Sequence, residues 1–258
     1  MSGAARKADV VADDLLRRIV AGELVPGSTL PREDALAEEY GVNRGVVREA
    51  IKQLEVHRLV RPVRRRGTEV LDPISSLSPE VLRAMIVPRP GQVRLPMLRS
   101  LLEIREHLDL QMVRLAAERA TEEDFDELEA LVDAMEAAVD DPPRFHELAD
   151  RFAQRQAQAT RNPIFLMMVH WNQSVVADLR SVLLAGRPVS ASFVTGLRVL
   201  LGLLRERRAE EAVSLASGFH RWARPRILAA AALASGQPLG DAALAAVEDP
   251  FSSAGAIR

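Results

Sequence analysis

The side chains that could do chemistry most directly are basic ones in the first quarter of the chain. Arg44, Arg48 and Lys52 recur every four residues, so on a helix they would form one cationic stripe. The opposite side of that helix would carry Val46, Val47, Ala50 and Leu54. Arginine and lysine at this spacing suit contacts with the phosphates and base edges of a nucleic acid. We therefore expect a helix that packs through one face and reads duplex DNA through the other.

The segments on either side of this helix indicate a winged helix-turn-helix. An apolar-periodic segment, 36–40, ends at the turn Gly41-Val42-Asn43, and Asn43 can cap the following helix, so the two helices must cross steeply. Residues 59–70, LVRPVRRRGTEV, give two short β-prone pieces around an Arg-rich turn, as in a wing. An earlier helix is expected over 8–21, before Pro26 and Gly27.

The overall charge hides a local excess of positive charge. The net charge is −2, yet residues 43–66 hold eight basic side chains against two acidic ones. Phosphate contacts depend on nearby charge more than on the total, because salt screens charges farther apart than about 10 Å. The count alone leaves a solvated charged face as an equal alternative.

Composition and length limit the possible classes of protein. With 258 residues, 48% of them hydrophobic and only 4% aromatic, the chain can form two domains built mainly from helices. It has no cysteine, which excludes disulfides, thiolate nucleophiles and Cys-based metal sites. We find no apolar run long enough for a membrane span and no secretory signal, so we expect a cytoplasmic protein with no membrane partner.

The expected fold class is mainly α, with an N-terminal winged helix-turn-helix, a small β-hairpin wing and a C-terminal all-α antiparallel helical bundle. The winged module should span 8–71. Five prolines in 71–96 predict a linker over 72–96 with at most one short helix at 79–87. An all-helical effector-binding and dimerisation domain should cover 97–234, and 235–258 should be a mobile tail. Turn signals divide that domain into helices expected at 97–120, 122–140, 143–160, 163–185, 189–206 and 209–233.

Long ordered stretches of the first 70 residues resemble the GntR family of bacterial transcription repressors. They are IVAGELVPGSTLPRE, LAEEYGVNRGVVREAIKQLE, and LV followed by the basic turn and GTEV. Residues 97–232 are similar, more weakly, to the FadR-type helical effector domain of that family, through LLEIREHLDLQMVRLAAERATEEDFDELEALVDAM and DRFAQRQAQATRNPIF. The resemblance implies a homodimer whose two reading helices enter successive major grooves of a pseudo-palindromic operator.

The resemblance also assigns DNA-binding residues. It places Arg44, Gly45 and Arg48 among the reading-helix contacts, Asn43 at the preceding cap, and Arg64 and Arg65 at the wing tip. Arginine can bind guanine O6 and N7 with two hydrogen bonds, whereas the wing arginines could equally meet phosphates or the minor groove.

Three positions depart from the family pattern. Asp34 stands where the family usually has a DNA-contacting Arg, and Arg32 either replaces that contact or leaves it lost. Arg58 and Arg65 stand where the family usually has glycine, so both add charge where the backbone normally needs freedom. These departures favour an altered operator preference over a loss of DNA binding.

The metal-binding positions of FadR-type effector domains are largely lost in this chain. Aligned on Asn162-Pro163, those positions fall on Ala149, Ala153, Leu197 and His220, and one imidazole cannot form a tight site. We therefore expect no metal and no cofactor. Asp141 and His146 imitate the lost motif in another register, although the more ordinary interpretation places His146 and Asp150 on the surface of an amphipathic helix.

Without a metal, the resemblance points to the acyl-coenzyme A branch of the family or to another organic acid as effector. Arg105 matches an arginine that faces the cavity in many of these domains and could bind a carboxylate or phosphate; a salt bridge within the bundle is an equal alternative. Arg105 and His220 are the candidate ligand-binding residues. Two other functions stay open. One is a metal-dependent or hydrolytic enzyme built on the helical domain, although the chain shows neither HExxH, nor GxSxG, nor a phosphate-binding Gly-rich loop; the other is a non-specific architectural nucleic-acid-binding protein.

Overall fold

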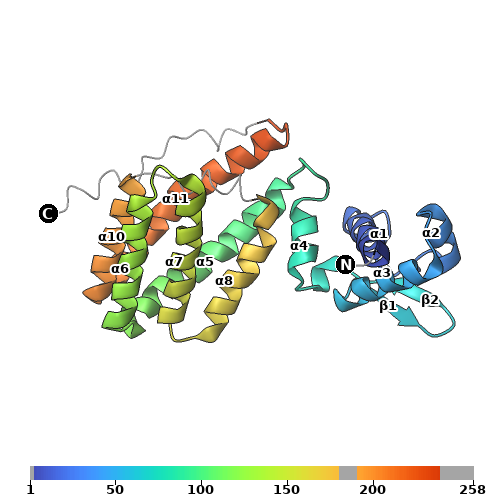
Figure 1. The fold of residues 1–258 in the computed structure, drawn as a ribbon, viewed down its shortest axis with the longest axis horizontal. Coiled ribbons are helices and arrows are strands. Elements are labelled where there is room, and N and C mark those ends of the chain that lie inside the picture. The colour runs from blue at the N-terminus through green and yellow to red at the C-terminus, as the bar shows by residue number, and fades with distance from the viewer. Residues whose placement is uncertain (1–2, 180–190, 239–258) are drawn as a thin grey trace. The chain divides into compact units, whose positions relative to one another are not determined.

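The computed structural model describes residues 3–179 and 191–238, which form two compact units, one up to Arg94 and the other from Leu95 (Figure 1). The tail expected at 235–258 lies almost wholly outside these residues. The helices of the N-terminal unit are α1 (Gly3–Ala21), α2 (Glu33–Glu39), α3 (Arg44–Val56) and α4 (Pro79–Ile86), and its strands are β1 (Val60–Val63) and β2 (Gly67–Val70). Those of the C-terminal unit are α5 (Leu95–Arg119), α6 (Glu122–Ala137), α7 (Pro142–Ala159), α8 (Pro163–Val175), α10 (Ala191–Arg205) and α11 (Ala209–Ala234). Two 3-10 turns cover Pro73–Ser75 and Ala177–Leu179.

The N-terminal unit is a winged helix-turn-helix, as the sequence predicts. Helices α1 and α2 both pack on α3 through a core that includes Leu15, Leu36 and Leu54. Strands β1 and β2 pair antiparallel, with Val60 opposite Val70 and Val63 opposite Gly67, and Thr29 extends the sheet by a bridge to Glu69. The wing is therefore fixed to the segment that leads into α2.

The segment predicted as a linker belongs in good part to the N-terminal unit. Helix α4 packs on α1, and its Val81 and Ala84 join the core around α1 and α3. The backbone N–H of Arg94 donates to Ile86 O at 2.8 Å. This unit thus extends beyond residue 71, because α4 has an apolar face that the proline count did not reveal.

The end of α3 is tied to the start of α4 by a polar cluster. Ser78 Oγ lies 2.9 Å from His57 Nδ1 and donates to Glu80 Oε2 at 2.5 Å. Burial opposes ionisation of Glu80, but the Ser78 hydroxyl, its own backbone N–H and the nearby positive charges outweigh it, so the pKa of Glu80 lies below its usual value. A charged Glu80 thus stabilises the contact between the two helices.

The C-terminal unit is a bundle whose core lies among α5, α6, α7, α10 and α11 (Figure 1). Its largest fully buried side chains include Phe125, Leu128, Met135, Phe145 and Leu148. The capping box that begins α6 forms as expected: Thr121 Oγ1 accepts from Asp124 N, and the Asp124 carboxylate accepts from Thr121 N at 2.7 Å. The core is thus closed where α5 turns into α6.

Two details of the bundle differ from the sequence prediction. The helix expected over 163–185 ends at Val175, and its last expected residues lie outside the described ranges. His146, expected on the surface, is only 7% exposed and lies edge-on to Phe145, with ring centroids 5.9 Å apart. That prediction was wrong, because α7 packs on both α6 and α8 and so buries more of its circumference than one apolar stripe implies.

Candidate functional sites

Helix α3 presents its cationic stripe to solvent. The side chains of Arg44 and Arg48 are 64% and 62% exposed, whereas Val46, Val47 and Leu54 on the other face are buried. The helix begins as predicted: Asn43 Oδ1 accepts a hydrogen bond from Val46 N at 3.0 Å. A Cβ at Gly45 would lie 3.1 Å from that capping oxygen, so glycine leaves the cap undisturbed.

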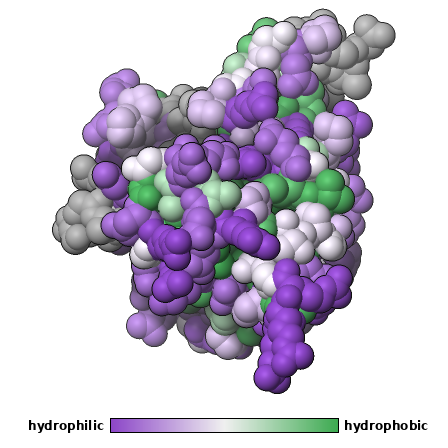
Figure 2. Space-filling view, turned by 90° about the vertical axis from the view of Figure 1, so that its right-hand side faces the viewer, coloured by the Kyte–Doolittle hydropathy of each residue, from purple (hydrophilic) through white to green (hydrophobic). Residues whose placement is uncertain are grey.

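The other predicted DNA-binding residues are exposed around the same unit. Arg32 lies at the N-cap position of α2 without making a capping bond, while Arg64 and Arg65 occupy the turn between β1 and β2. Figure 2 shows a face dominated by hydrophilic side chains. Buried leucine and valine side chains hold the helices together, and the arginine side chains of α3 stay exposed, where an external polyanion can reach them.

Both arginines that replace family glycines adopt the backbone conformation that favours glycine. The φ angle is 55° at Arg58 and 64° at Arg65. At the end of α3, Leu59 N donates to Leu54 O and Arg58 N donates to Glu55 O, each at 2.9 Å, which is a Schellman motif with arginine in the glycine position. The turns are thus kept and only the side chains differ.

Acidic residues of α2, which the sequence prediction did not place, pair with the arginines of α3. Asp34 forms an ion pair with Arg44, and Arg48 Nε donates to Glu33 Oε2 at 2.7 Å. The steep crossing of α2 and α3 brings these residues together although ten or more residues separate each pair. Sequence spacing gives no signal for such a contact, because the crossing angle decides it.

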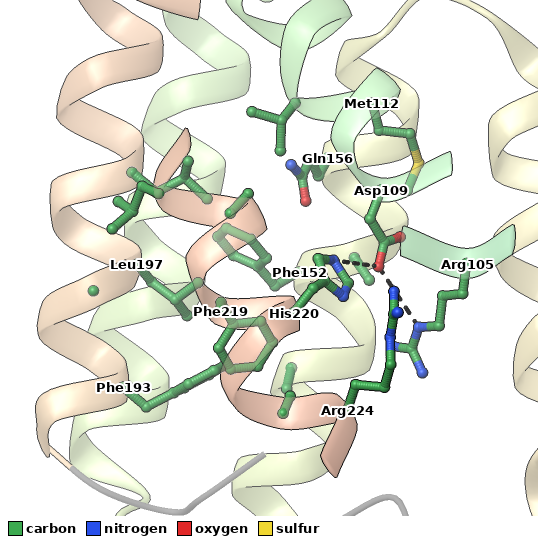
Figure 3. Close-up of a pocket in the computed structure, with 18 of the residues that line it drawn as sticks. Arg105, Asp109, Met112, Phe152, Gln156, Phe193, Leu197, Phe219, His220 and Arg224 are labelled. Carbon is green, nitrogen blue, oxygen red and sulfur yellow. Dashed lines mark ion pairs between the residues drawn. The ribbon is translucent and has the colours of Figure 1, made fainter. Parts of the chain in front are cut away.

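The C-terminal unit contains a cavity of about 150 Å³ that both predicted ligand residues line. Its polar end holds Arg105 and Asp109 of α5 and His220 and Arg224 of α11 (Figure 3). Most of the remaining wall is apolar and includes Leu102, Met112, Phe152, Phe193, Leu197 and Phe219. A mainly apolar wall with charges at one end suits a ligand that has an apolar body and a charged group.

One carboxylate, that of Asp109, contacts two of the basic groups of the cavity. Asp109 Oδ2 lies 3.4 Å from His220 Nε2 and 3.6 Å from Arg105 Nε, while Arg224 pairs with Glu106. The longer distance exceeds the usual hydrogen-bond range, so charge rather than a short hydrogen bond joins Arg105 Nε to Asp109. Arg105 therefore combines the two roles considered for it, as a cavity cation and as a partner in a salt bridge. The i,i+4 spacing of Arg105 and Asp109 could have indicated this pair.

The positions that match the family's metal ligands converge on this cavity, but they do not fit a metal. Ala149, Ala153 and Leu197 line it together with His220 and supply no donor atoms. Within residues 3–179 and 191–238, no three His, Asp or Glu side chains are grouped as a metal ion requires. Asp141 is used otherwise, since its carboxylate caps α7 by accepting from Arg144 N at 3.2 Å.

Among the helices in the described parts of the chain, none has the length and apolar character needed to cross a membrane.

Comparisons with known proteins agree with this architecture. The family model described as "Bacterial regulatory proteins, gntR family" matches residues 7–70, and the FCD domain model matches residues 100–218. The chain is 32% identical over 160 residues to the galactonate operon transcriptional repressor of Escherichia coli (strain K12), covering 61% of this chain and 69% of that protein. It is 30% identical over 193 residues to the uncharacterized HTH-type transcriptional regulator Rv0494 of Mycobacterium tuberculosis, covering 74% of this chain and 77% of that protein.

A solved structure supports the fold. The one titled "Lar controls the expression of the Listeria monocytogenes agr system and mediates virulence" aligns with a TM-score of 0.54 at 21% identity, covering 87% of this chain and 95% of that one. None of these names belongs to an enzyme. The chain therefore belongs to the GntR family of bacterial regulatory proteins, joins a winged helix-turn-helix to an FCD domain, and is a DNA-binding transcriptional regulator.

Proposed function

We propose that this protein is a homodimeric repressor that binds a pseudo-palindromic operator through α3 and the wing. The observation that carries the proposal is the exposed pair Arg44 and Arg48 on one face of a capped helix. At the start of a reading helix, two such guanidinium groups can bind guanine edges in the major groove. The residues proposed for the interface are Arg32, Asn43, Arg44, Gly45, Arg48, Arg64 and Arg65.

Asn43 acts in this proposal through the backbone. Its side chain fixes the first turn of α3, and that turn carries Arg44 and Gly45. Gly45 leaves space beside Arg44 and Arg48 for close approach to a groove, since it has no side chain. Arg64 and Arg65 lie at the wing tip, where they can contact phosphates or enter a minor groove. A regulator that binds chromosomal DNA would work in the cytoplasm of a bacterium.

The proposed effector is a small organic acid with an apolar body, bound in the cavity of the FCD domain. Arg105 and Arg224 supply cationic donors for a carboxylate, His220 lies beside them, and the aromatic and aliphatic wall receives the rest. A cavity of about 150 Å³ matches a benzene-sized group. An acyl-coenzyme A could place only part of itself there, so the cavity favours the smaller acid of the two expected ligand classes.

Effector binding would shift the population of dimers between spacings that fit the operator and spacings that do not. An effector can do this only by the difference between its affinities for the two forms. The E. coli relative is named a galactonate operon repressor, and galactonate is a carboxylate. The name agrees with a carboxylate metabolite in the operon that the relative controls, whereas the apolar body of the proposed effector rests on the cavity wall alone, because galactonate carries hydroxyl groups along its chain.

The DNA-binding part of the proposal is tested by selection from a random duplex library, followed by fluorescence anisotropy with the selected duplex. Arg48→Ala should weaken specific binding by about 1–3 kcal/mol, because one guanidinium contact to a base edge is lost. The matched control is Arg114→Ala, which removes an arginine that pairs with Glu210 on the C-terminal unit and should leave DNA affinity unchanged. Failure of the wild-type protein to enrich any sequence would overturn the proposal.

A further inference from the structure

The first turn of α2 is acidic and faces the cations of α3. Glu33 and Asp34 are consecutive, and each pairs with a different arginine of the reading helix, Arg48 and Arg44 respectively. Glu38 and Glu39, at the other end of α2, are also acidic, but Glu39 pairs with Arg18 of α1 instead. Only the first turn of α2 therefore supplies the reading arginines with counter-charges that the structure describes.

Both ion pairs use the same part of the guanidinium group. Arg44 and Arg48 each direct Nε at the carboxylate. A guanidinium carries five N–H donors in a rigid plane, so a carboxylate that takes Nε leaves the donors of the two terminal amino groups available for another acceptor. Two parallel donors are what guanine O6 and N7 require.

All four side chains remain accessible while paired. The Asp34 and Arg44 side chains are 60% and 64% exposed, and the Glu33 and Arg48 side chains are 38% and 62% exposed. Exposed ion pairs contribute little to folding, typically below about 1 kcal/mol. The two ion pairs on the proposed DNA-binding face therefore contribute little to the free energy of unfolding.

We infer that Asp34, together with Glu33, determines base specificity by positioning the arginines of the reading helix. Asp34 holds Arg44 and Glu33 holds Arg48, so each arginine reaches a base edge with its fork already oriented. The carboxylates also repel phosphates, which lowers the affinity for DNA that offers no matching guanine. Both effects raise the ratio of specific to non-specific binding. This inference rests on the proposed function, since it takes α3 as the reading helix.

The test measures base preference at each position of the selected duplex. Arg44→Ala first identifies the base pair that Arg44 reads, as the position where discrimination is lost. Asp34→Asn should lower discrimination at that same position by about tenfold and should tighten binding to a scrambled duplex. Glu33→Gln should do the same at the position identified by Arg48→Ala. Asp34→Glu should restore part of the discrimination.

Glu38→Gln is the matched control, because it removes the same charge from an exposed residue of the same helix. It should tighten binding to every duplex by one common factor. The inference is overturned when Asp34→Asn behaves like Glu38→Gln, or when its loss of discrimination falls at a different base pair from that of Arg44→Ala. If the wild-type protein enriches a sequence, either result counts against the positioning role of Asp34 and leaves the proposed function standing. If it enriches none, the result counts against the proposed function.

Circular dichroism and thermal unfolding of each variant exclude a folding defect. The midpoint should move little for Asp34→Asn, because both partners of the ion pair are exposed. A salt titration adds a further readout. The slope of log affinity against log salt for the scrambled duplex should become steeper in Asp34→Asn, since Arg44 is then free to meet a phosphate.

Discussion

The carboxylate of Asp109 on α5 and the imidazole of His220 on α11 lie 3.4 Å apart, and this contact joins the two long helices across the polar end of the cavity. Arg105 Nε lies 3.6 Å from Oδ2 of the same carboxylate, the oxygen that also contacts His220. An incoming ligand carboxylate would take the place of Asp109 at Arg105. In the proposed function, ligand binding would therefore change the charge around Asp109, the residue that joins α5 to α11 through His220.

The cavity gives a first prediction. Arg105→Ala should weaken binding of carboxylate ligands about tenfold or more, because a charge-assisted hydrogen bond is lost in a mainly apolar site. The measurement is the thermal shift of the full chain with a panel of aromatic and branched aliphatic carboxylates. Arg114→Ala, on the same helix but outside the cavity, is the control. An equal shift in wild type and Arg105→Ala would contradict the proposed role.

The left-handed arginines give a second prediction. Arg58→Gly should stabilise the N-terminal unit by about 1 kcal/mol, because glycine adopts a φ of 55° without the clash that a Cβ causes. Arg65→Gly should give a similar gain and should also weaken DNA binding through loss of a wing cation. Arg66→Gly, in the same turn but without a positive φ, should lose stability instead. Urea unfolding followed by circular dichroism measures all three, and a loss of stability in Arg58→Gly would refute the strain argument.

Buried charge gives a third prediction. The Asp124 side chain is 1% exposed and forms ion pairs with Arg155 at 2.8 Å and Arg161 at 2.5 Å. Asp124→Asn should destabilise the C-terminal unit by about 2 kcal/mol, because the hydrogen bonds that this buried carboxylate accepts from Thr121 and the two arginines lose the charge of their acceptor and the capping box is weakened. Asp126→Asn, two residues along the same helix and 73% exposed, should change stability by less than about 0.5 kcal/mol. Chemical denaturation measures the free energy of unfolding of both variants. Each loses one negative charge but only Asp124 is buried, so similar losses of stability would argue against a special role of the buried carboxylate.

Acid unfolding gives a fourth prediction. Burial opposes the charged form of Asp124, but hydrogen bonds from Thr121 and the charges of Arg155 and Arg161 outweigh it and lower its pKa from the ordinary 3.8. A group with a lowered folded-state pKa contributes stability above its unfolded pKa and loses it as the pH falls through the folded value. Wild type should therefore lose this contribution only below about pH 3.8. Asp124→Asn should lack that part of the acid transition, and an unchanged acid profile would rule out the role of Asp124.

Much of the fold is readable from the sequence because local chemistry determines it. Asn43 marks the start of α3, and Thr121 with Asp124 marks the start of α6, since each side chain caps its own helix. The early end of α8 at Val175 was not readable, because the following residues contain no glycine or proline to stop a helix.

The sites show the same division. Exposure of Arg44 follows from the periodicity of α3, and the cavity position of Arg105 was indicated through the family resemblance. The partner of Arg105, Asp109, follows the i,i+4 spacing of one helix, whereas the partner of Arg44 depends on a contact between two helices. Asp34 stood out only as a departure from the family pattern, and its contact with Arg44 depends on how α2 crosses α3. Periodicity along one helix thus cannot reveal an ion-pair partner that lies on a neighbouring helix.

The boundary between the two units lies between Arg94 and Leu95, where α5 begins. The same helix carries Arg105 about three turns further on. One continuous helix, α5, therefore connects the cavity of the FCD domain to the Arg94–Leu95 boundary. A small rotation of α5 at the cavity would be transmitted along the helix to its first residue, Leu95, where the N-terminal unit is attached. Lengthening the chain at the joint with a glycine-rich insert would disconnect sensing from DNA binding while leaving each intact.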